Sequence, residues 1–436
     1  MEEEKRPLFN LKAVVRETGV PAPTLRSWER RYGLPRPQRA PSGRRLYSRR
    51  DVETVRWLAR RLSEGMTIGQ AVALWRSLEE AGQDPLVGYP RRPAEQPTAE
   101  QEALKRWRDA WVTACLAFDE SAADATFGQA LAIFPPEMAC TEILQAGLAQ
   151  IGEAWYRGDA TVHQEHFASY LAARRVQALL AATAPPSRSD PVLVVCPPGE
   201  NHAFGPLLLT YLLRRAGWRV IYLGADLPVA ETEAAVRRAA PRWVIAAAYQ
   251  LPPVVGIQAL GLTLQEMGVP LAYGGRIFNR VPALRLRMTG HFLGERMEEA
   301  PTRLEAWAVQ PPPLPPSLSA PEEYRHTWTL YQEQEWPIRT RVLSLLSTHP
   351  ITRDLPDWLP EYTFSHIRSA LVLGDMALAD AYADWLRGLR DGFSLPSGWV
   401  APFLEAYRKG IERYLDKDGA PLLEWLERQI DSATVA

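Results

Sequence analysis

Hydrophobic positions along the chain follow two different periods, which separate helical segments from β-rich ones. In residues 8–80 and 101–184, apolar residues recur every three to four positions, as expected for amphipathic helices. Between residues 191 and 306 the pattern changes to short apolar runs, PVLVVCP, WRVIYLG, RWVIAAAYQL and VPLAYGG, which alternate with helical stretches. This alternation is typical of βα units that build a parallel sheet.

Breaks in the pattern divide the helical segments further. The second segment is interrupted near Asp119, Pro135 and Gly158, which predicts about four helices, enough for a small bundle. The stretch 81–100 is rich in Pro, Gly and polar residues and is typical of a linker. QPPPLPPSLSAP, residues 310–321, predicts a stiff, extended spacer, and the residues after it return to helical spacing.

Composition limits the class of protein. Hydrophobic residues make up 46% of the 436 residues, and no run approaches the roughly 18 apolar residues of a membrane span, so we expect no membrane association. The N-terminus MEEEKRPLFN is charged and lacks the apolar core of a signal peptide. The three cysteines, Cys115, Cys140 and Cys196, are far apart, which argues against disulfides and indicates a cytoplasmic protein.

Charge is distributed unevenly, although the net charge is only −1. Residues 5–61 hold sixteen Lys and Arg against four Asp and Glu, a surplus of +12, so the rest of the chain carries −13. A solvated basic face is the simpler explanation, but so many unbalanced charges in one small domain would repel one another without a polyanion. The basic end therefore predicts nucleic-acid binding.

Within the basic end, LKAVVRETGVPAPTLRSWERRYGL predicts two helices joined by a turn at residues 19–21. We expect Thr24 to cap or begin the second helix, and Leu25 and Trp28 to lie in the core. The following PSGRRLYS predicts a turn and a short strand, a wing, before helices over 49–63 and 67–78. The side chains expected to face DNA are Thr24, Arg26, Ser27, Arg30 and Arg31 of the second helix and Arg44, Arg45 and Tyr47 of the wing.

RSWERRYGLPRPQR and GRRLYS resemble the pattern of the MerR family of transcription regulators. The resemblance implies a winged helix-turn-helix (HTH) that binds double-stranded DNA as a dimer, with the second helix in the major groove and the wing on the backbone. Metal-sensing members of this family use cysteines beyond this domain. No cysteine precedes Cys115, so metal sensing is not expected.

GENHAFG, residues 199–205, follows the first strand of the β-rich segment, at the edge where parallel sheets bind ligands. His202 would project from that edge, and Glu200 could accept a hydrogen bond from one ring nitrogen, leaving the other as a metal donor. Gly205 would let a bulky group approach the backbone closely. The small residues that could line a slot beside the sheet include Ala247, Gly274 and Gly275.

This arrangement resembles the cobalamin-binding domain of corrinoid methyltransferases and mutases, whose signature is Asp-x-His-x-x-Gly, a later Ser-x-Leu and a Gly-Gly pair. Here the first element reads Glu200-x-His202-x-x-Gly205, the last reads Gly274-Gly275, and Ala247 and Tyr249 stand in place of Ser and Leu. The resemblance implies that His202 is the lower axial ligand of cobalt, with the nucleotide tail in the slot. The alternative is a Rossmann-like domain with an incidental loop histidine.

The helical bundle carries a second marker. In EAWYRGDATVHQEHFASYLAARRVQ, Trp155 is followed after nine residues by Glu165-His166. Trp-x9-Glu-His resembles the cap of the cobalamin-dependent, light-sensing MerR regulators of the CarH and LitR type. The resemblance implies that Trp155 roofs the corrin, that Glu165 binds the ribose of an adenosyl group and that His166 lies nearby. The simpler alternative is a core tryptophan beside a polar helix face.

One departure from that resemblance concerns the upper cobalt ligand. In those light sensors a histidine directly follows the cap tryptophan and binds cobalt after photolysis, whereas this chain has Tyr156. A phenol is a far poorer ligand to cobalamin than a neutral imidazole. Tyr156 and Ala247 therefore leave open a light-independent regulator that responds to cobalamin abundance or redox state, and a regulator whose pocket has lost cobalamin.

Patterns and resemblances together predict a DNA-binding transcription regulator, a repressor, with adenosylcobalamin as its light-sensitive ligand and a dimer or tetramer as its assembly. A corrinoid enzyme subunit is disfavoured, because catalysis does not need the basic winged domain. The expected class is a multidomain α and α/β protein. Its parts are a winged HTH domain (1–80), a linker (81–100), a four-helix cap bundle (101–186), a Rossmann-like parallel α/β domain (187–308), a Pro-rich linker (309–321) and a helical domain (322–436).

The helical domain at the end of the chain has no counterpart in these resemblances. We expect it to serve oligomerisation or partner binding. Its histidines show no ligand spacing, and its tryptophans are expected in the core. These tryptophans are Trp328, Trp336, Trp358, Trp385 and Trp425.

Overall fold

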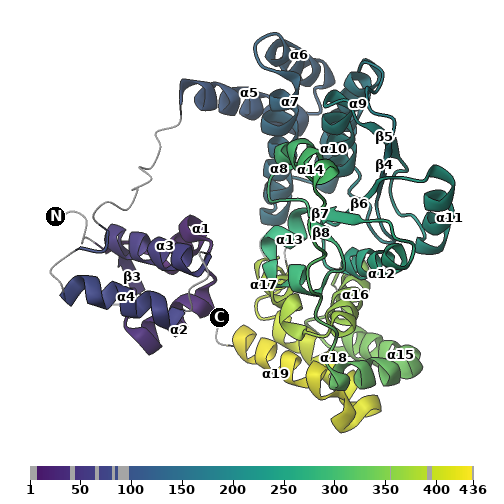
Figure 1. The fold of residues 1–436 in the computed structure, drawn as a ribbon. Helices are drawn as coiled ribbons and strands as arrows, with labels where there is room; N and C mark the ends of the chain where they lie inside the picture. The colour runs from purple at the N-terminus through teal and green to yellow at the C-terminus, as the bar shows by residue number, and fades with distance from the viewer. Residues whose placement is uncertain are drawn as a thin grey trace. The chain divides into compact units, whose positions relative to one another are not determined.

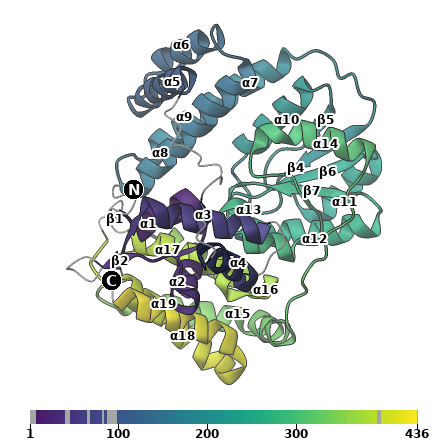
Figure 2. The same ribbon diagram turned by 60° about the vertical axis from the view of Figure 1, so that its left-hand side comes forward.

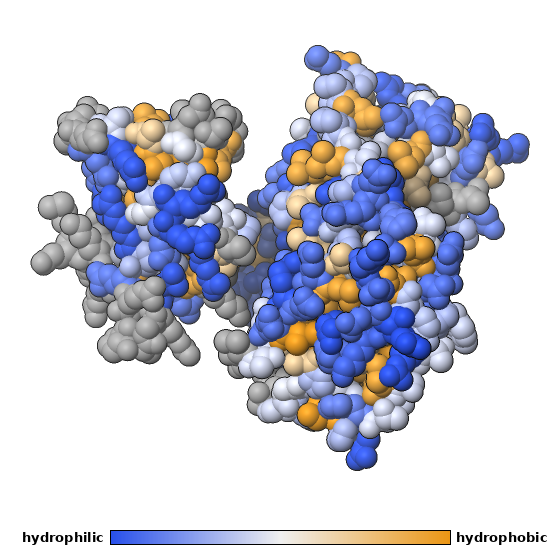
Figure 3. All heavy atoms as spheres, turned by 90° about the horizontal axis from the view of Figure 1, so that it is seen from below, coloured by the Kyte–Doolittle hydropathy of each residue, from blue (hydrophilic) through white to orange (hydrophobic). Residues whose placement is uncertain are grey.

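The computed structural model describes residues 7–39, 45–63, 68–80, 84–86, 98–353, 355–389 and 395–434 (Figure 1). The chain forms two compact units, Met1–Thr98 and Ala99–Ala436. Hydrophilic side chains cover most of the face shown in Figure 3, with apolar side chains in patches between them. Among the described residues, no helix is long and apolar enough to span a membrane.

The first unit packs four helices against a small antiparallel sheet in the order β1-β3-β2. The first helix ends at Gly19, whose φ of 71° is the left-handed conformation that glycine adopts most easily. The second begins at Ala22 after Pro21, two residues before the predicted start at Thr24. The elements are β1 (Pro7–Asn10), α1 (Leu11–Thr18), α2 (Ala22–Tyr32), β2 (Gln38–Arg39), β3 (Arg45–Ser48), α3 (Arg49–Ser63) and α4 (Ile68–Glu80).

The second unit begins with the predicted helical bundle. The helices end where the breaks were expected, and Gly158, with a φ of 83°, closes α8. The next helix starts with a capping box between Thr161 and Gln164. The elements are α5 (Ala99–Leu116), α6 (Glu120–Leu131), α7 (Pro136–Ala139), the π-helical turn η2 (Cys140–Gln145), α8 (Ala146–Arg157) and α9 (Val162–Ala181).

A parallel sheet in the order β5-β4-β6-β7-β8 forms a separate layer beside the bundle (Figure 2). The chain leaves β4 on one side for β5 and returns to β6 on the other, so the loops after β4 and β6 meet at a topological switch point. The strands are β4 (Pro191–Val195), β5 (Arg219–Tyr222), β6 (Trp243–Ala247), β7 (Leu271–Gly274) and the short, unpredicted β8 (His291–Phe292). The helices are α10 (Phe204–Arg215), α11 (Val229–Ala239), α12 (Pro252–Glu266), α13 (Arg276–Arg280), η3 (Pro282–Arg287), η4 (Met297–Glu299) and α14 (Ala300–Val309).

The C-terminal helices pack on the sheet domain instead of standing apart beyond the Pro-rich stretch. Buried residues of α12 and α16 belong to one continuous apolar core, and the amide of Leu318 in the Pro-rich stretch donates to the carbonyl of Leu286 at 2.8 Å. Trp425 is buried as expected, but Trp336 is 78% exposed and Trp358 is 40% exposed, so these two are not core residues. The elements are α15 (Glu322–Thr348), α16 (Trp358–Leu373), η5 (Met376–Ala379), α17 (Asp380–Gly388), α18 (Val400–Leu415), η6 (Asp416–Gly419) and α19 (Ala420–Thr434).

Candidate functional site

The loop after β4 is organised around the buried carboxylate of Glu200, which is only 1% exposed. Its Oε1 accepts hydrogen bonds from the Nδ1 of His202 at 2.7 Å and from the backbone amide of the same residue at 2.8 Å. Its Oε2 accepts from the backbone amide of Tyr249, in the loop after β6, at 2.5 Å. The carboxylate thus ties together the two loops of the switch point and satisfies its own buried charge.

His202 is oriented by this carboxylate. Because an ionised carboxylate only accepts hydrogen bonds, this contact places a proton on Nδ1, and in the neutral ring the lone pair then lies on Nε2. The side chain is 46% exposed, so Nε2 is open to a ligand from the edge of the sheet. The ring of Tyr249 stacks on the imidazole with 4.3 Å between centroids and 23° between planes, which fixes the imidazole plane. A neutral imidazole with an orienting carboxylate is the usual arrangement of a metal-binding histidine.

The predicted slot residues lie at the ends of neighbouring strands. Ala247 on β6 is paired with Gly274 on β7. Gly275 has a φ of 115°, and a Cβ there would overlap the carbonyl oxygen of Ala248, so the close approach of these two strand ends requires glycine. A Cβ at Gly205 would contact Met297 at 3.8 Å, and one at Gly274 would contact Leu293 at 3.9 Å, which are ordinary van der Waals distances. These two positions could therefore accept a small side chain.

The cap residues come from the helical hairpin α8–α9. Trp155 is partly buried in the last turn of α8, and Glu165 lies in the first turn of α9. Glu165 accepts a hydrogen bond from the hydroxyl of Ser169 at 2.7 Å, and its Oε2 lies 3.7 Å from the Nε2 of His166, whose side chain is 76% exposed. A short turn thus brings the Trp-x9-Glu-His residues to the same end of the hairpin.

One apolar core joins the cap to the His202 loop. Helix α10, which follows that loop directly, contributes Leu208 and Tyr211 to the same buried cluster as Ala168 and Leu171 of α9. The hydroxyl of Tyr222 on β5 also donates to the carbonyl of Ala203 at 3.2 Å, just before α10 begins. The structure therefore holds the start of α10 against both the bundle and the sheet.

Tyr156, at the position of the family's upper-ligand histidine, turns toward the C-terminal helices. Its hydroxyl donates to the carbonyl oxygen of Trp385 on α17 at 3.0 Å, and the two rings stack with centroids 6.1 Å apart. No pattern in the sequence predicts this contact, because the two residues are 229 positions apart. It makes the C-terminal helices neighbours of the cap.

The thiols do not belong to a metal site. Burial raises the pKa of Cys115, Cys140 and Cys196 to about 12 in each case, so none of them is a thiolate near neutral pH. Within the described ranges, no group of three or more His, Cys, Asp or Glu side chains is placed to hold a metal ion.

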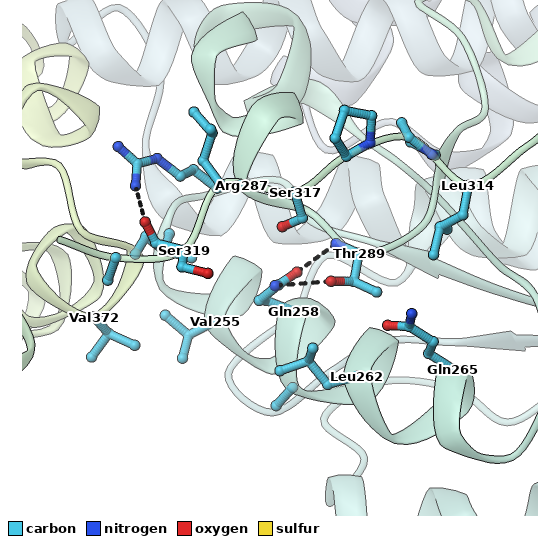
Figure 4. A pocket seen from close by; sticks show the side chains of 16 residues that line it. Val255, Gln258, Leu262, Gln265, Arg287, Thr289, Leu314, Ser317, Ser319 and Val372 are labelled. Atoms are coloured by element: carbon cyan, nitrogen blue, oxygen red, sulfur yellow. Dashed lines mark hydrogen bonds between the residues drawn. The ribbon is translucent and has the colours of Figure 1, made fainter.

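A groove of about 710 Å³ lies elsewhere on the second unit, between α12, α16 and the Pro-rich stretch (Figure 4). Three of the polar side chains that line it have partners within the protein. The side chain of Gln258 bonds both the hydroxyl and the amide of Thr289, and Arg287 donates to the carbonyl of Ser319 at 3.2 Å. None of the predicted cofactor-binding residues lines this groove.

The structure places most of the residues that were predicted to face DNA, on helix α2 and on the wing. Arg26, Arg30 and Arg31 of α2 are exposed, and Thr24 and Ser27 are partly buried on the same helix. In the wing, the Nε of Arg45 donates to both carboxylate oxygens of Glu29, at 2.7 and 3.0 Å, so that charge is partly neutralised within the domain. Arg44 lies outside the described residues.

Tyr47 was expected to face DNA, and the structure corrects this expectation. The side chain is fully buried in the core of the first unit, in the same cluster as Trp28 and Val52. Its hydroxyl has no hydrogen-bond partner among the described residues. The ring therefore packs the wing strand onto the helices and is not available to a nucleic acid.

Comparisons with known proteins match two parts of the chain, the first unit and the helical bundle. The family described as MerR HTH family regulatory protein matches residues 9–78, and the one described as B12 binding domain matches residues 107–180, within the bundle. Two solved structures show a distant similarity to part of the chain. The monomethylamine corrinoid protein of Methanosarcina barkeri is 18% identical with a TM-score of 0.39, over 49% of this chain and 100% of its own. A cobalamin-binding protein of Desulfitobacterium hafniense is 20% identical with a TM-score of 0.26, over 46% of this chain and 97% of its own.

Two curated relatives from Myxococcus xanthus are more similar in sequence. The HTH-type transcriptional repressor CarH is 34% identical over 236 residues, which are 54% of this chain and 77% of CarH. The HTH-type transcriptional repressor CarA is 34% identical over 235 residues, 53% of this chain and 74% of its own length. The chain belongs to the family of MerR-type HTH transcriptional repressors that includes CarH and CarA.

Proposed function

We propose that this protein is a cobalamin-dependent, DNA-binding transcription repressor of the cytoplasm, and not an enzyme. The observation that carries the proposal is the pair formed by Glu200 and His202 at the switch point of the sheet. The pair presents a single imidazole that the buried carboxylate orients, in a chain that also matches the B12 binding domain over its bundle. The residues present fit a corrinoid.

In this proposal, each predicted residue has a role toward the cofactor. His202 would hold the cobalt through its Nε2, and Glu200 would keep the ring of His202 in the required tautomer and plane. Gly205, Ala247, Gly274 and Gly275 leave room for the nucleotide tail. The cap residues that would lie over the corrin and its upper ligand are Trp155, Glu165 and His166.

Bound cobalamin supplies a cobalt centre whose upper ligand can be exchanged or, in the adenosyl form, released by light. The chain's own residues then respond to the size of that ligand. Trp155 would cover it with a flat apolar surface, and the carboxylate of Glu165 would accept hydrogen bonds from ribose hydroxyls. A ligand changes the state of the protein only through contacts that differ between its two states, and these two cap residues supply such contacts.

DNA binding belongs to the first unit. The exposed arginines of α2, Arg26, Arg30 and Arg31, bind phosphates and base edges of an operator, while Thr24 and Ser27 lie on the same helix. A single small head binds weakly at physiological salt, whereas a dimer or tetramer links several heads and gains affinity through effective concentration. Control of assembly by cobalamin would therefore control repression.

The second candidate function is a regulator that responds to cobalamin without light, and one observation favours it. The hydroxyl of Tyr156 is bonded to the carbonyl of Trp385, so this position offers no free ligand to the upper face of cobalt. A regulator that responds to cobalamin itself would need no such ligand.

The test measures how DNA affinity depends on the cofactor and on illumination. The full-length protein would be given a duplex that it selects from a random library, and the Kd would be measured without cofactor, with adenosylcobalamin in the dark, and after illumination. Light scattering would record the assembly in each sample. The proposal predicts a change of at least tenfold in Kd on adding cobalamin, and equal values with and without cofactor would reject it. If illumination reverses the change in Kd, the protein is a light sensor. If the Kd with adenosylcobalamin is equal in the dark and after illumination, the protein is the light-independent regulator.

A further inference from the structure

The C-terminal helices form one folded body with the sheet domain. Val254 and Ile257 of α12 share a continuous buried cluster with Ile367 and Leu371 of α16. In Figure 1 the pair α16–α17 lies beside α12 and α13. A movement of these helices relative to the sheet would expose this apolar surface to water, so they are held in a fixed position.

The same pair of helices reaches the cap. The hydroxyl of Tyr156 on α8 donates to the carbonyl of Trp385 on α17, and the two rings stack with 23° between their planes. The Tyr156 hydroxyl rests against Gly388 on α17, where any side chain would overlap it. Tyr156 directly follows Trp155, so this contact determines where the last turn of α8 lies.

The pair also reaches the loops that hold His202. The guanidinium of Arg280 on α13 donates to the carbonyl of Ala381 on α17 at 3.2 Å. Burial raises the pKa of Tyr362 on α16, and the side chain of Gln250 lowers it slightly, so these two side chains are neighbours. Gln250 directly follows Tyr249, whose ring stacks on His202. Helices α16 and α17 therefore contact both sides of the candidate cofactor site, the cap above and the loops after β6 and β7 below.

We propose that α16 and α17 are a third wall of the cobalamin site, which fixes the separation between cap and sheet. This inference rests on the proposed function. Trp385 is a positioning residue for the turn that carries Trp155, and Tyr362 is a positioning residue for the loop that stacks on His202. A corrinoid bound between cap and sheet would then meet a separation that these helices already set, and a movement of the cap would break the bond between Tyr156 and Trp385. The C-terminal helices thus sense the position of the cap.

The first test needs no cofactor. Gly388→Ala places a methyl group where the Tyr156 hydroxyl rests while favouring the helix itself, and Tyr156→Phe removes the hydrogen bond but keeps the ring. Hydrogen exchange of the ligand-free protein should show amides of α17, residues 380–388, and of the end of α8 exchanging about tenfold faster in both variants. Gly128→Ala is the control, because Gly128 lies in α6 with no atom within 4 Å of a Cβ, and it should leave both segments unchanged.

The second test measures cofactor affinity. Hydroxocobalamin would be titrated into the full-length protein and followed by visible absorbance. Gly388→Ala and Tyr156→Phe should bind about five- to tenfold more weakly than wild type with an unchanged spectrum of the bound form, because the walls and not the cobalt ligand have been altered. Gly128→Ala should match wild type.

The outcomes separate this inference from the proposed function. Exchange rates and affinities within twofold of wild type in both variants would overturn the third wall and leave the cobalamin site intact. Faster exchange with unaltered affinity would overturn it as well, because the contact would then not set the cleft. Wild-type protein that binds no hydroxocobalamin would overturn the proposed function, and the role of this wall with it.

Discussion

Replacing Glu200 with glutamine tests whether the buried carboxylate prepares His202 for cobalt. The substitution keeps the size of the side chain but turns one of its two oxygens into an NH2 group. One oxygen accepts from the His202 ring and amide, and the other accepts from the amide of Tyr249. Either orientation of the new amide therefore sets a donor against a donor and leaves a buried N–H without a partner, at about 1–3 kcal/mol.

The expected effect on the cofactor follows from that geometry. Loss of the partner that orients a metal-binding histidine typically weakens metal binding by about 10- to 100-fold, or about 1.4–2.7 kcal/mol. Titration of hydroxocobalamin in dim light, followed by visible absorbance, would measure this change in Kd. Glu266→Gln, on the exposed side of α12, is the matched control and should bind as wild type does. A Glu200→Gln protein within twofold of wild type would refute the reasoning.

Three further predictions concern stability and DNA. Burial lowers the pKa of His366 from 6.5 to about 4. As the pH falls below 6.5 the unfolded chain binds this proton before the folded chain does, so the free energy of unfolding is highest above pH 6.5 and decreases as the pH falls toward 4. Urea unfolding should show a loss of about 2 kcal/mol at pH 5. Gly275→Ala should lower stability by about 2 kcal/mol or more, because a Cβ at a φ of 115° meets the carbonyl of Ala248. Arg30→Ala should weaken DNA binding and reduce the slope of log Kd against log salt by about 1, while Tyr47→Phe leaves that slope unchanged because its hydroxyl is buried.

Each of these predictions has a control within the chain. His366→Gln should remove the loss of stability between pH 7.5 and pH 5, whereas His326→Gln, at a side chain that is 59% exposed, should keep it. Gly128→Ala should be neutral or stabilising by up to about 1 kcal/mol, since glycine disfavours a helix. An equal pH dependence in both histidine variants, a stable Gly275→Ala protein, or a changed salt slope in Tyr47→Phe would contradict the respective prediction.

The elements themselves were predictable because their ends carry local chemical signals. Glycine and proline mark the breaks at residues 19–21, 135–136 and 158. In the structure α1 ends at the first break, α7 begins at the second and α8 ends at the third. The parallel sheet followed from four short apolar runs, whereas β8, with only two residues, is too short to show a period. The pairing of Glu200 with His202 was also expected, because the two residues are close in sequence.

The tertiary contacts were not predictable from the same patterns. An apolar helix face shows that something covers it but not what does, so the packing of α16 and α17 on the sheet domain and the contact between Tyr156 and Trp385 could not be foreseen. The side of the wing strand that faces the core was predicted wrongly for a related reason. Tyr47 and Leu46 are adjacent and face opposite sides of the strand, and the sequence alone did not show which side the core occupies.

The central claim is that the imidazole of His202 binds cobalt, and electron paramagnetic resonance of the cobalt(II) form tests it most directly. Full-length protein would be loaded with cobalamin, and the cobalt would be reduced to cobalt(II). The spectrum would be compared with those of protein labelled with ¹⁵N-histidine and of the His202→Ala variant. If His202 is the axial ligand, the nitrogen splitting of the cobalt lines changes from a triplet to a doublet on labelling, and His202→Ala loses the labelled signal. A triplet that persists in the ¹⁵N-labelled protein would show that another nitrogen binds the metal, and would contradict the account.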